Sequence, residues 1–257
     1  MVRPAPTARA ATALLLALFL VLVAVGCTRS EPKAQAVRAA LPPTTLAPLP
    51  PPPPTAPPNS VVATATVPSV DVFAEPAGAT PSSSFSNPTD YYVEPLVFLV
   101  KQARDEWLEV FLPARPNGST GWVRAADVAL SETDWRLQVD LDDHRLTVWK
   151  GADVVREETV AIGTDSAPTP TGEYYLTERL DTGNPRGPYG PWAFGLSAYS
   201  DVHTSFAGGP GQVGLHGTND PSSLGRSVSN GCVRITNDAI TALAAELPVG
   251  SPISIVA

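Results

Sequence analysis

The sequence predicts a mainly β protein, made of two folded parts and one main helix near the C-terminus. Short apolar runs are separated by clusters of Pro, Gly, Ser and Asn, which is typical of strands and turns. Apolar and polar residues alternate over 135–150, and helical spacing of apolar residues occurs at 237–247. About 200 residues follow the N-terminal 60, enough for one large domain or two small ones.

Residues 1–27 read as a secretory signal peptide. Arg3 and Arg9 precede an apolar run that ends at Gly26-Cys27, and its core is short for a membrane-spanning helix. A small residue followed by cysteine resembles the lipobox of bacterial lipoproteins, although Ala24 stands where leucine is usual. The resemblance implies that Cys27 is lipidated and anchors an extracytoplasmic protein to the outer face of the cell membrane. The alternatives are secretion into the cell wall and an uncleaved signal anchor.

Residues 28–60 are rich in Pro, Ala and Thr and include the run Pro50 to Pro54. Such a composition cannot form a packed core, and proline favours extended chain. We expect a disordered stalk that lets the folded body reach into a surrounding polymer.

Residues 61–133 are expected to form a small β-domain, with strands at 70–73, 96–100 and 107–112. The end of this segment, WLEVFLPARPNGSTGWVRAADV, resembles a bacterial SH3-like domain, a small β-barrel. Trp107 and Trp122 either pack this barrel or form a peptide-binding surface. The Ser- and Pro-rich stretch 77–91 is expected to be a long loop.

Residues 134–257 are expected to form a second β-domain. A hairpin is predicted over 137–150, with His144 at its turn, and further strands at 154–162, 172–178, 212–216 and 252–256. A helix is predicted from an N-cap at Asn237 through Leu247.

The segment 181–201 is rich in Gly, Pro and aromatic residues and precedes the strand at 212–216. It forms either a wall or lid over a cleft or an ordinary loop that packs on the core. His203, just beyond it, is a candidate for substrate contact.

The main candidate for chemistry is Cys232, because the chain's other cysteine, Cys27, lies in the leader. His216 lies a short loop upstream, and a thiol that attacks a carbonyl needs a base or a positive partner. We expect His216 to supply the positive charge that holds Cys232 as a thiolate, so that the two form a thiolate–imidazolium pair. The ordinary alternative is that Cys232 is a small buried hydrophobic residue without a chemical role. A buried structural cysteine has little need of the glycine and polar residues that precede Cys232, so we favour the catalytic interpretation.

The segment HGTNDPSSLGRSVSNGCVRI resembles the signature of the L,D-transpeptidase family, the YkuD-type catalytic domain. The matching residues are His216, Gly217, Thr218, Ser229, Gly231, Cys232 and Arg234. A TPTG sequence at 169–172 extends the resemblance over about 135–257. Many members have histidine where this chain has Asn230. The order His before Cys argues against papain-like enzymes.

The resemblance implies a mixed β-sandwich and a cysteine acyl-enzyme. Cys232 is then the nucleophile, His216 the base, and the carbonyl of Gly217 the group that orients the imidazole. The remaining predicted site residues are expected to bind substrate or the oxyanion: they are Gly231, Asn230, Ser229 and Arg234. Arg234 is expected on the same side of a strand as the thiol.

By this resemblance, the protein forms peptidoglycan cross-links between stem peptides with release of D-alanine, which would place it in cell-wall synthesis and cell shape. The alternatives are an L,D-carboxypeptidase, an enzyme that attaches proteins to peptidoglycan, and a silent wall-binding lipoprotein. The family implies no cofactor and no metal. A net charge of −8 argues against a nucleic-acid partner, and we expect a monomer.

Overall fold

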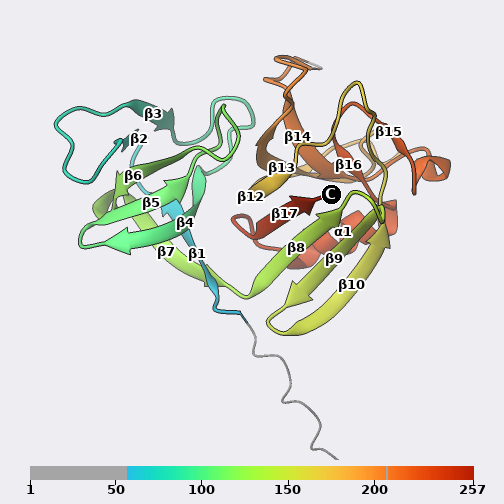
Figure 1. The fold of residues 1–257 in the computed structure, drawn as a ribbon, viewed down its shortest axis with the longest axis horizontal. Helices are drawn as coiled ribbons and strands as arrows, with labels where there is room; N and C mark the ends of the chain where they lie inside the picture. Colours follow the sequence, from blue (N-terminus) through green and yellow to red (C-terminus); the bar gives the residue numbers. More distant parts are fainter. Residues whose placement is uncertain (1–56, 207) are drawn as a thin grey trace, which may run out of the picture. The chain divides into compact units, whose positions relative to one another are not determined.

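The structure is a computed structural model, and it describes residues 57–206 and 208–257. The signal peptide, Cys27 and most of the stalk predicted from sequence lie outside the described residues. The described part is mainly β, with the single α-helix α1 (Figure 1). In that part, no helix has the length and apolar character needed to cross a bilayer.

Residues 60–133, called the first region, contain a five-stranded antiparallel sheet in the order β6-β5-β4-β1-β7. Its strands are β1 (Ser60–Ala65), β4 (Val97–Arg104), β5 (Trp107–Phe111), β6 (Thr120–Arg124) and β7 (Val128–Thr133). A short 3-10 helix, η1 (Ala125–Asp127), precedes β7. Strand β5, which begins at Trp107, pairs with β6, which contains Gly121, Trp122 and Val123.

The sequence predicted a long loop over 77–91, but this stretch is not only a loop. It contains β3 (Ser83–Ser86), which pairs with β2 (Ser69–Val72). The run of serines hid this strand, because β3 is mostly exposed and lacks the apolar alternation on which the prediction depended. Trp107 and Trp122 are buried beside Phe73, so they pack the first region and do not form an open binding surface.

Residues 134–257, called the second region, contain an eight-stranded sheet in the order β10-β9-β8-β17-β12-β13-β14-β16. Its strands are β8 (Trp135–Asp140), β9 (Arg145–Lys150), β10 (Asp153–Thr159), β12 (Gly172–Asp181), β13 (Trp192–Tyr199), β14 (Gln212–His216), β16 (Val233–Arg234) and β17 (Pro252–Val256). A second, two-stranded sheet joins β11 (Ile162–Gly163) to β15 (Ser227–Ser229), and η2 (Pro221–Ser223) is a 3-10 turn.

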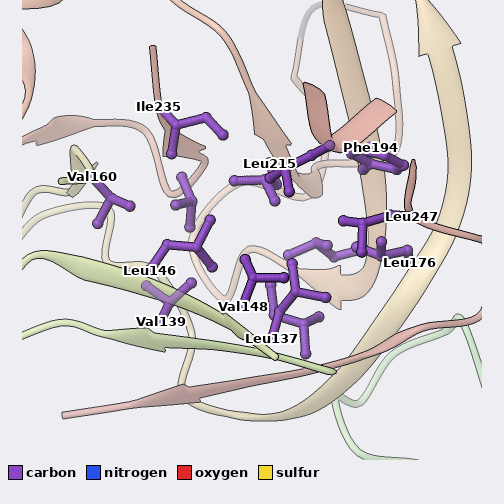
Figure 2. Close-up of a cluster of buried hydrophobic side chains, with 14 of the residues drawn as sticks. Leu137, Val139, Leu146, Val148, Val160, Leu176, Phe194, Leu215, Ile235 and Leu247 are labelled. Carbon is purple, nitrogen blue, oxygen red and sulfur yellow. The ribbon is translucent and has the colours of Figure 1, made fainter. Parts of the chain in front are cut away.

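Strict alternation explains how this sheet buries one face. In β8, buried and half-buried residues alternate along all six positions, so its apolar side chains all point to one side. Figure 2 shows side chains from both halves of the sheet gathered in one interior. The labelled members include Leu137, Val139, Leu146, Val148, Leu176, Phe194, Leu215 and Leu247. A β-sheet with α1 against it encloses this core.

Helix α1 (Asn237–Glu246) begins one residue earlier than predicted. Its N-cap is Thr236, whose side chain accepts a hydrogen bond from the backbone N–H of Ala239. Thr and Asn are both good N-caps, so the sequence alone did not separate the two positions. Asn237 therefore has its side chain free for contacts elsewhere.

The segment 181–201 is divided between two structures. Trp192–Tyr199 is strand β13, which lies between β12 and β14 and buries Phe194 and Leu196 in the core. The loop reading was therefore wrong for this half, because its glycine and aromatic content masked the alternation. Residues 182–191 form the loop that precedes β13, and it contains Tyr189.

The two regions contact each other through a small apolar cluster. Tyr175 of β12 is fully buried against Val62, Val97 and Leu99 of the first region. Its hydroxyl donates to the carbonyl of Val97 at 3.1 Å. The chain passes from β7 to β8 through Asp134 alone.

Candidate active site

Strand β14 places its alternate residues on two faces. Val213 and Leu215 belong to the buried core, so Gln212, Gly214 and His216 face the other side of the sheet. On that side these three residues line a cleft of about 430 Å³.

Cys232 reaches the same cleft from the neighbouring strand. β16 runs parallel to β14, with Leu215 opposite Val233 and His216 opposite Arg234. Continued by one residue, this register places Cys232, which directly precedes β16, beside Gly214. Cys232 lines the cleft together with His216, and Gly214 makes a backbone hydrogen bond to the thiol. The structure thus brings the predicted nucleophile and base into one cavity.

His216 is held in a defined orientation. Its Nδ1 lies 2.6 Å from the carbonyl oxygen of Gly217. Because a carbonyl only accepts, Nδ1 carries the proton, and the neutral ring keeps the lone pair of Nε2 as a proton acceptor. The ring of Tyr189 packs edge-on to the imidazole at 4.8 Å between centroids.

The backbone after His216 is fixed by Asn237, a residue that sequence analysis assigned only to capping. Its Oδ1 accepts from the backbone N–H of Thr218 at 2.9 Å, and its Nδ2 donates to the carbonyl of Pro185. A Cβ at Gly217 would overlap Asn237 Oδ1. Glycine is therefore required at 217 so that the carbonyl that orients the imidazole can stay in place.

Electrostatics favour a neutral thiol and a neutral imidazole in the resting protein. Burial raises the pKa of Cys232, against smaller opposite effects of the Gly214 hydrogen bond and the charge of Arg234. Burial lowers the pKa of His216 to about 4, and the charge of Arg234 acts in the same direction, against the Gly217 hydrogen bond. The expected thiolate–imidazolium pair is therefore not the resting state that this environment favours.

The residues before the thiol are tied to one another. Ser229 Oγ donates to the carbonyl of Cys232 at 2.6 Å and accepts from the N–H of Gly231 at 3.1 Å. The N–H of Gly231 is thus directed at Ser229, not at the cleft, which differs from the oxyanion role expected for it. Gly231 has φ of +112°, a conformation that favours glycine.

Arg234 acts on the site by charge. It does not line the cleft, and its guanidinium Nε is buried without a hydrogen-bond partner in the described part of the chain. Its charge nevertheless lowers the pKa of both Cys232 and His216.

A small hollow lies on another side of the thiol. Cys232, Asn230 and His203 line it together with Ser200 and neighbouring residues. The Nε2 of His203 is buried and has no hydrogen-bond partner among the described residues. A second imidazole therefore lies near the thiol, beside Asn230.

The cleft also has aromatic walls, of which sequence analysis suggested only the segment 181–201 that contains Tyr189. Tyr91 and Tyr92, from the first region, line it together with Tyr189 and Phe206. Tyr91 is the last residue of the stretch 77–91 that was read as a loop, and Tyr92 follows it directly. Their signal was two adjacent tyrosines in a polar loop, because loops that carry exposed aromatic residues are often binding elements.

A buried carboxylate lies beneath one edge of the cleft. Glu178 is hydrogen-bonded by Thr177 and Gln212, and its oxygen fills the space that a Cβ of Gly195 would occupy. Burial raises its pKa. Among residues 57–206 and 208–257, there is no group of three or more His, Cys, Asp or Glu residues arranged for a metal ion.

Comparison with known proteins identifies the second region. Residues 134–255 match the model of the YkuD family, described as the L,D-transpeptidase catalytic domain. A putative L,D-transpeptidase YkuD of Bacillus licheniformis is 33% identical over 154 residues, which cover 57% of this chain and 85% of the relative. The putative L,D-transpeptidase YkuD of Bacillus subtilis is 32% identical, over 47% of this chain and 65% of the relative.

Solved structures give a weaker likeness. An L,D-transpeptidase from Mycobacterium smegmatis aligns with a TM-score of 0.38 and 18% sequence identity. The alignment covers 63% of this chain and 90% of the mycobacterial chain. An Enterococcus faecium L,D-transpeptidase mutant aligns with a TM-score of 0.37 and 21% identity, over 48% of this chain and 49% of that one.

Proposed function

Because the chain belongs to the YkuD family of L,D-transpeptidase catalytic domains, we propose that it is a peptidoglycan L,D-transpeptidase that works through a cysteine acyl-enzyme. The observation that carries this proposal is the pairing of Cys232 and His216 in one cleft. Peptidoglycan stem peptides are the proposed substrates, and the protein uses no cofactor.

In the first step, the thiol of Cys232 attacks the carbonyl of the third, L-centred residue of a stem peptide. Nε2 of His216 takes the thiol proton, as expected of a neutral base whose Nδ1 proton is held by Gly217. The tetrahedral intermediate then breaks its bond to the terminal D-alanine. His216 gives the proton to the leaving amine, and a thioester remains.

In the second step, the amine of a neighbouring stem attacks the thioester. His216 takes a proton from that amine and returns it to the departing thiol, so that the enzyme is restored and a cross-link is formed. The N–H of Cys232 is our candidate donor to the oxyanion, since the N–H of Gly231 is bonded to Ser229. Asn230, on the hollow beside the thiol, is a candidate for substrate contact.

We further propose that the first region is an SH3-like domain and that the protein is an extracytoplasmic lipoprotein anchored through Cys27. Support for the first is the small antiparallel sheet, with Trp107 and Trp122 packed inside. Support for the second is the sequence of residues 1–27 and the Pro-rich stalk at 28–60.

The test is product analysis by mass spectrometry after mixing purified protein with disaccharide-tetrapeptide. We expect a cross-linked dimer that has lost one D-alanine, absent with Cys232→Ala. Free tripeptide alone would reassign the protein as an L,D-carboxypeptidase, because water and amine resolve the same acyl-enzyme. Unchanged substrate would favour protein attachment or a silent wall-binding role.

A further inference from the structure

We propose that the first region completes the substrate cleft, so that residues of both regions bind the stem peptide. Arg115 is the positioning residue: it holds together the chain that leaves β13 and the chain that enters β14. Tyr91 and Tyr92 supply a wall of the same cleft. The inference rests on the proposed function, because it states how that site takes its stem peptide.

One guanidinium makes three hydrogen bonds to the second region. Nη1 of Arg115 donates to the carbonyl of Pro210 at 2.9 Å, and Nη2 donates to those of Ser200 and His203, each at 3.0 Å. The same group lies 4.8 Å over the ring of Tyr199. A planar fork with several donors suits such a joint contact, and a lysine could not reproduce it.

Asn117 strengthens the same junction. Its Nδ2 donates to the carbonyl of Tyr199 at 2.7 Å, and its Oδ1 accepts from the N–H of Tyr199 at 2.8 Å. The hydroxyl of Tyr199 in turn donates to the carbonyl of Pro113 at 2.8 Å. A turn of the first region thus binds the end of β13 through both backbone and side chain.

The chain held in this way borders the site. Phe206, Gly209, Pro210 and Gly211 line the cleft. His203 lines the hollow beside Cys232. The position of this wall therefore depends on Arg115, whereas the thiol and His216 are fixed by strands β14 and β16 of the second region.

The tyrosine pair faces the cleft from the first region. The rings of Tyr91 and Tyr92 pack edge to face at 4.6 Å, and the ring of Tyr91 lies against Gly209. Burial, with smaller contributions from nearby acidic groups that include Glu178 and Cys232, raises the pKa of Tyr92 to about 12. Its hydroxyl thus stays protonated, and the wall offers apolar ring surface with a hydrogen-bond donor, as suits a peptide.

These contacts do more than dock the two regions. The cluster around Tyr175 already joins the sheets, and none of its members lines the cleft. Loss of Arg115 should therefore leave the regions docked while it releases the cleft wall. The expected result is weaker substrate binding with little change in chemistry at the thiol.

The experiment uses the full chain, with disaccharide-tetrapeptide as substrate. Arg115→Ala and Tyr92→Ala should each raise KM about tenfold and leave kcat within about threefold, as when a binding interaction is removed. Arg115→Lys should fall between Arg115→Ala and the unaltered protein. The control is Arg104→Ala: Arg104 lies over Trp122 within the first region, and its loss should change neither constant. Alkylation of Cys232 by iodoacetamide should proceed at the same rate in all of these proteins.

Two results would overturn the inference while the proposed function stands. One is an unchanged KM in Arg115→Ala and Tyr92→Ala, and the other is a parallel loss of kcat and of thiol alkylation, which would mean a general structural role. Tyr92 lies on a different segment from Arg115. If Arg115→Ala does not fold, the KM of Tyr92→Ala still tests the inference. If the unaltered protein has no activity on the tetrapeptide, the proposed function itself fails.

Discussion

The two sides of the cleft are built in different ways. On one side, His216 ends strand β14 and Cys232 directly precedes β16, the neighbouring strand, and both residues come from a single stretch of sequence. On the other side, Tyr91 and Tyr92 come from a region more than a hundred residues away and are placed by tertiary contacts. The comparison teaches that the proposed nucleophile and base are encoded locally, whereas the proposed binding surface depends on how two regions pack.

The largest expected effect comes from the local side. Cys232→Ala removes the nucleophile, so cross-linking should fall by at least about 10³-fold, in the range found when a covalent catalyst is removed. The measurement is the rate of dimer formation, with the melting temperature as a check that the fold is retained. Substantial residual cross-linking in a folded variant would contradict the assignment.

His216→Gln should come next, with a loss of about 10² to 10⁴-fold, the usual contribution of a general base. A matched control is His144→Gln, since His144 lies at a turn and contacts Ser227 outside the cleft. Equal activity losses in the two variants would argue against a special role for His216.

The pH dependence tests whether the pair is neutral. Because burial lowers the pKa of His216 to about 4, the base stays unprotonated down to that value, and the acid limb of kcat/KM should lie near pH 4. Its folded-state pKa lies below the unfolded value of about 6.5. Stability should therefore be kept above pH 6.5 and fall between 6.5 and 4, by up to about 1.4 kcal/mol per pH unit.

An activity limb near pH 6.5 would show that His216 titrates normally. In that case the burial argument, and with it the neutral resting pair, would be wrong. The activity profile is measured on free enzyme at low substrate concentration, and stability by urea unfolding at each pH.

Asn237→Ala should have a smaller effect. It removes the acceptor of the Thr218 N–H and frees the backbone that carries the orienting carbonyl of Gly217. The free energy of unfolding should fall by about 1 to 3 kcal/mol, and kcat should fall about tenfold. Asn219→Ala, on the exposed side of the same loop, is the control. Equal effects of both variants on kcat would mean that the Asn237 contact does not position the imidazole.

The smallest effect is expected at the contact between the regions. Tyr175→Phe removes a buried hydrogen bond to Val97 and should cost about 1 kcal/mol. It should also increase proteolytic cleavage at 131–134. The control is Tyr174→Phe, whose hydroxyl bonds to Thr171 within the second region. If both variants are cut equally at 131–134, this hydrogen bond does not help to join the regions.

Sequence predicted the parts that depend on local pattern. Strands β14 and β17 matched their predicted ranges, since alternation and flanking turns fix such elements. The helix start was wrong by one residue, because Thr236 and Asn237 are both suitable caps. Strand β13 was missed, since its Gly and aromatic residues resemble a loop.

The distant contacts could not be predicted. Nothing in the residues around Arg115 indicates that its guanidinium binds carbonyls some 85 to 95 positions away. The lowered pKa of His216 likewise depends on burial that only the fold creates. Such features arise from packing between elements, which residue pattern does not encode in a readable form.

The most direct test of the account is intact-protein mass spectrometry after rapid mixing with disaccharide-tetrapeptide and acid quenching. We predict an adduct with the mass of the disaccharide-tripeptide acyl group, found on the peptide that contains Cys232 and absent from Cys232→Ala. If the protein turns over this substrate while Cys232 stays unmodified at every time point and an adduct forms on another residue, the cysteine acyl-enzyme is contradicted.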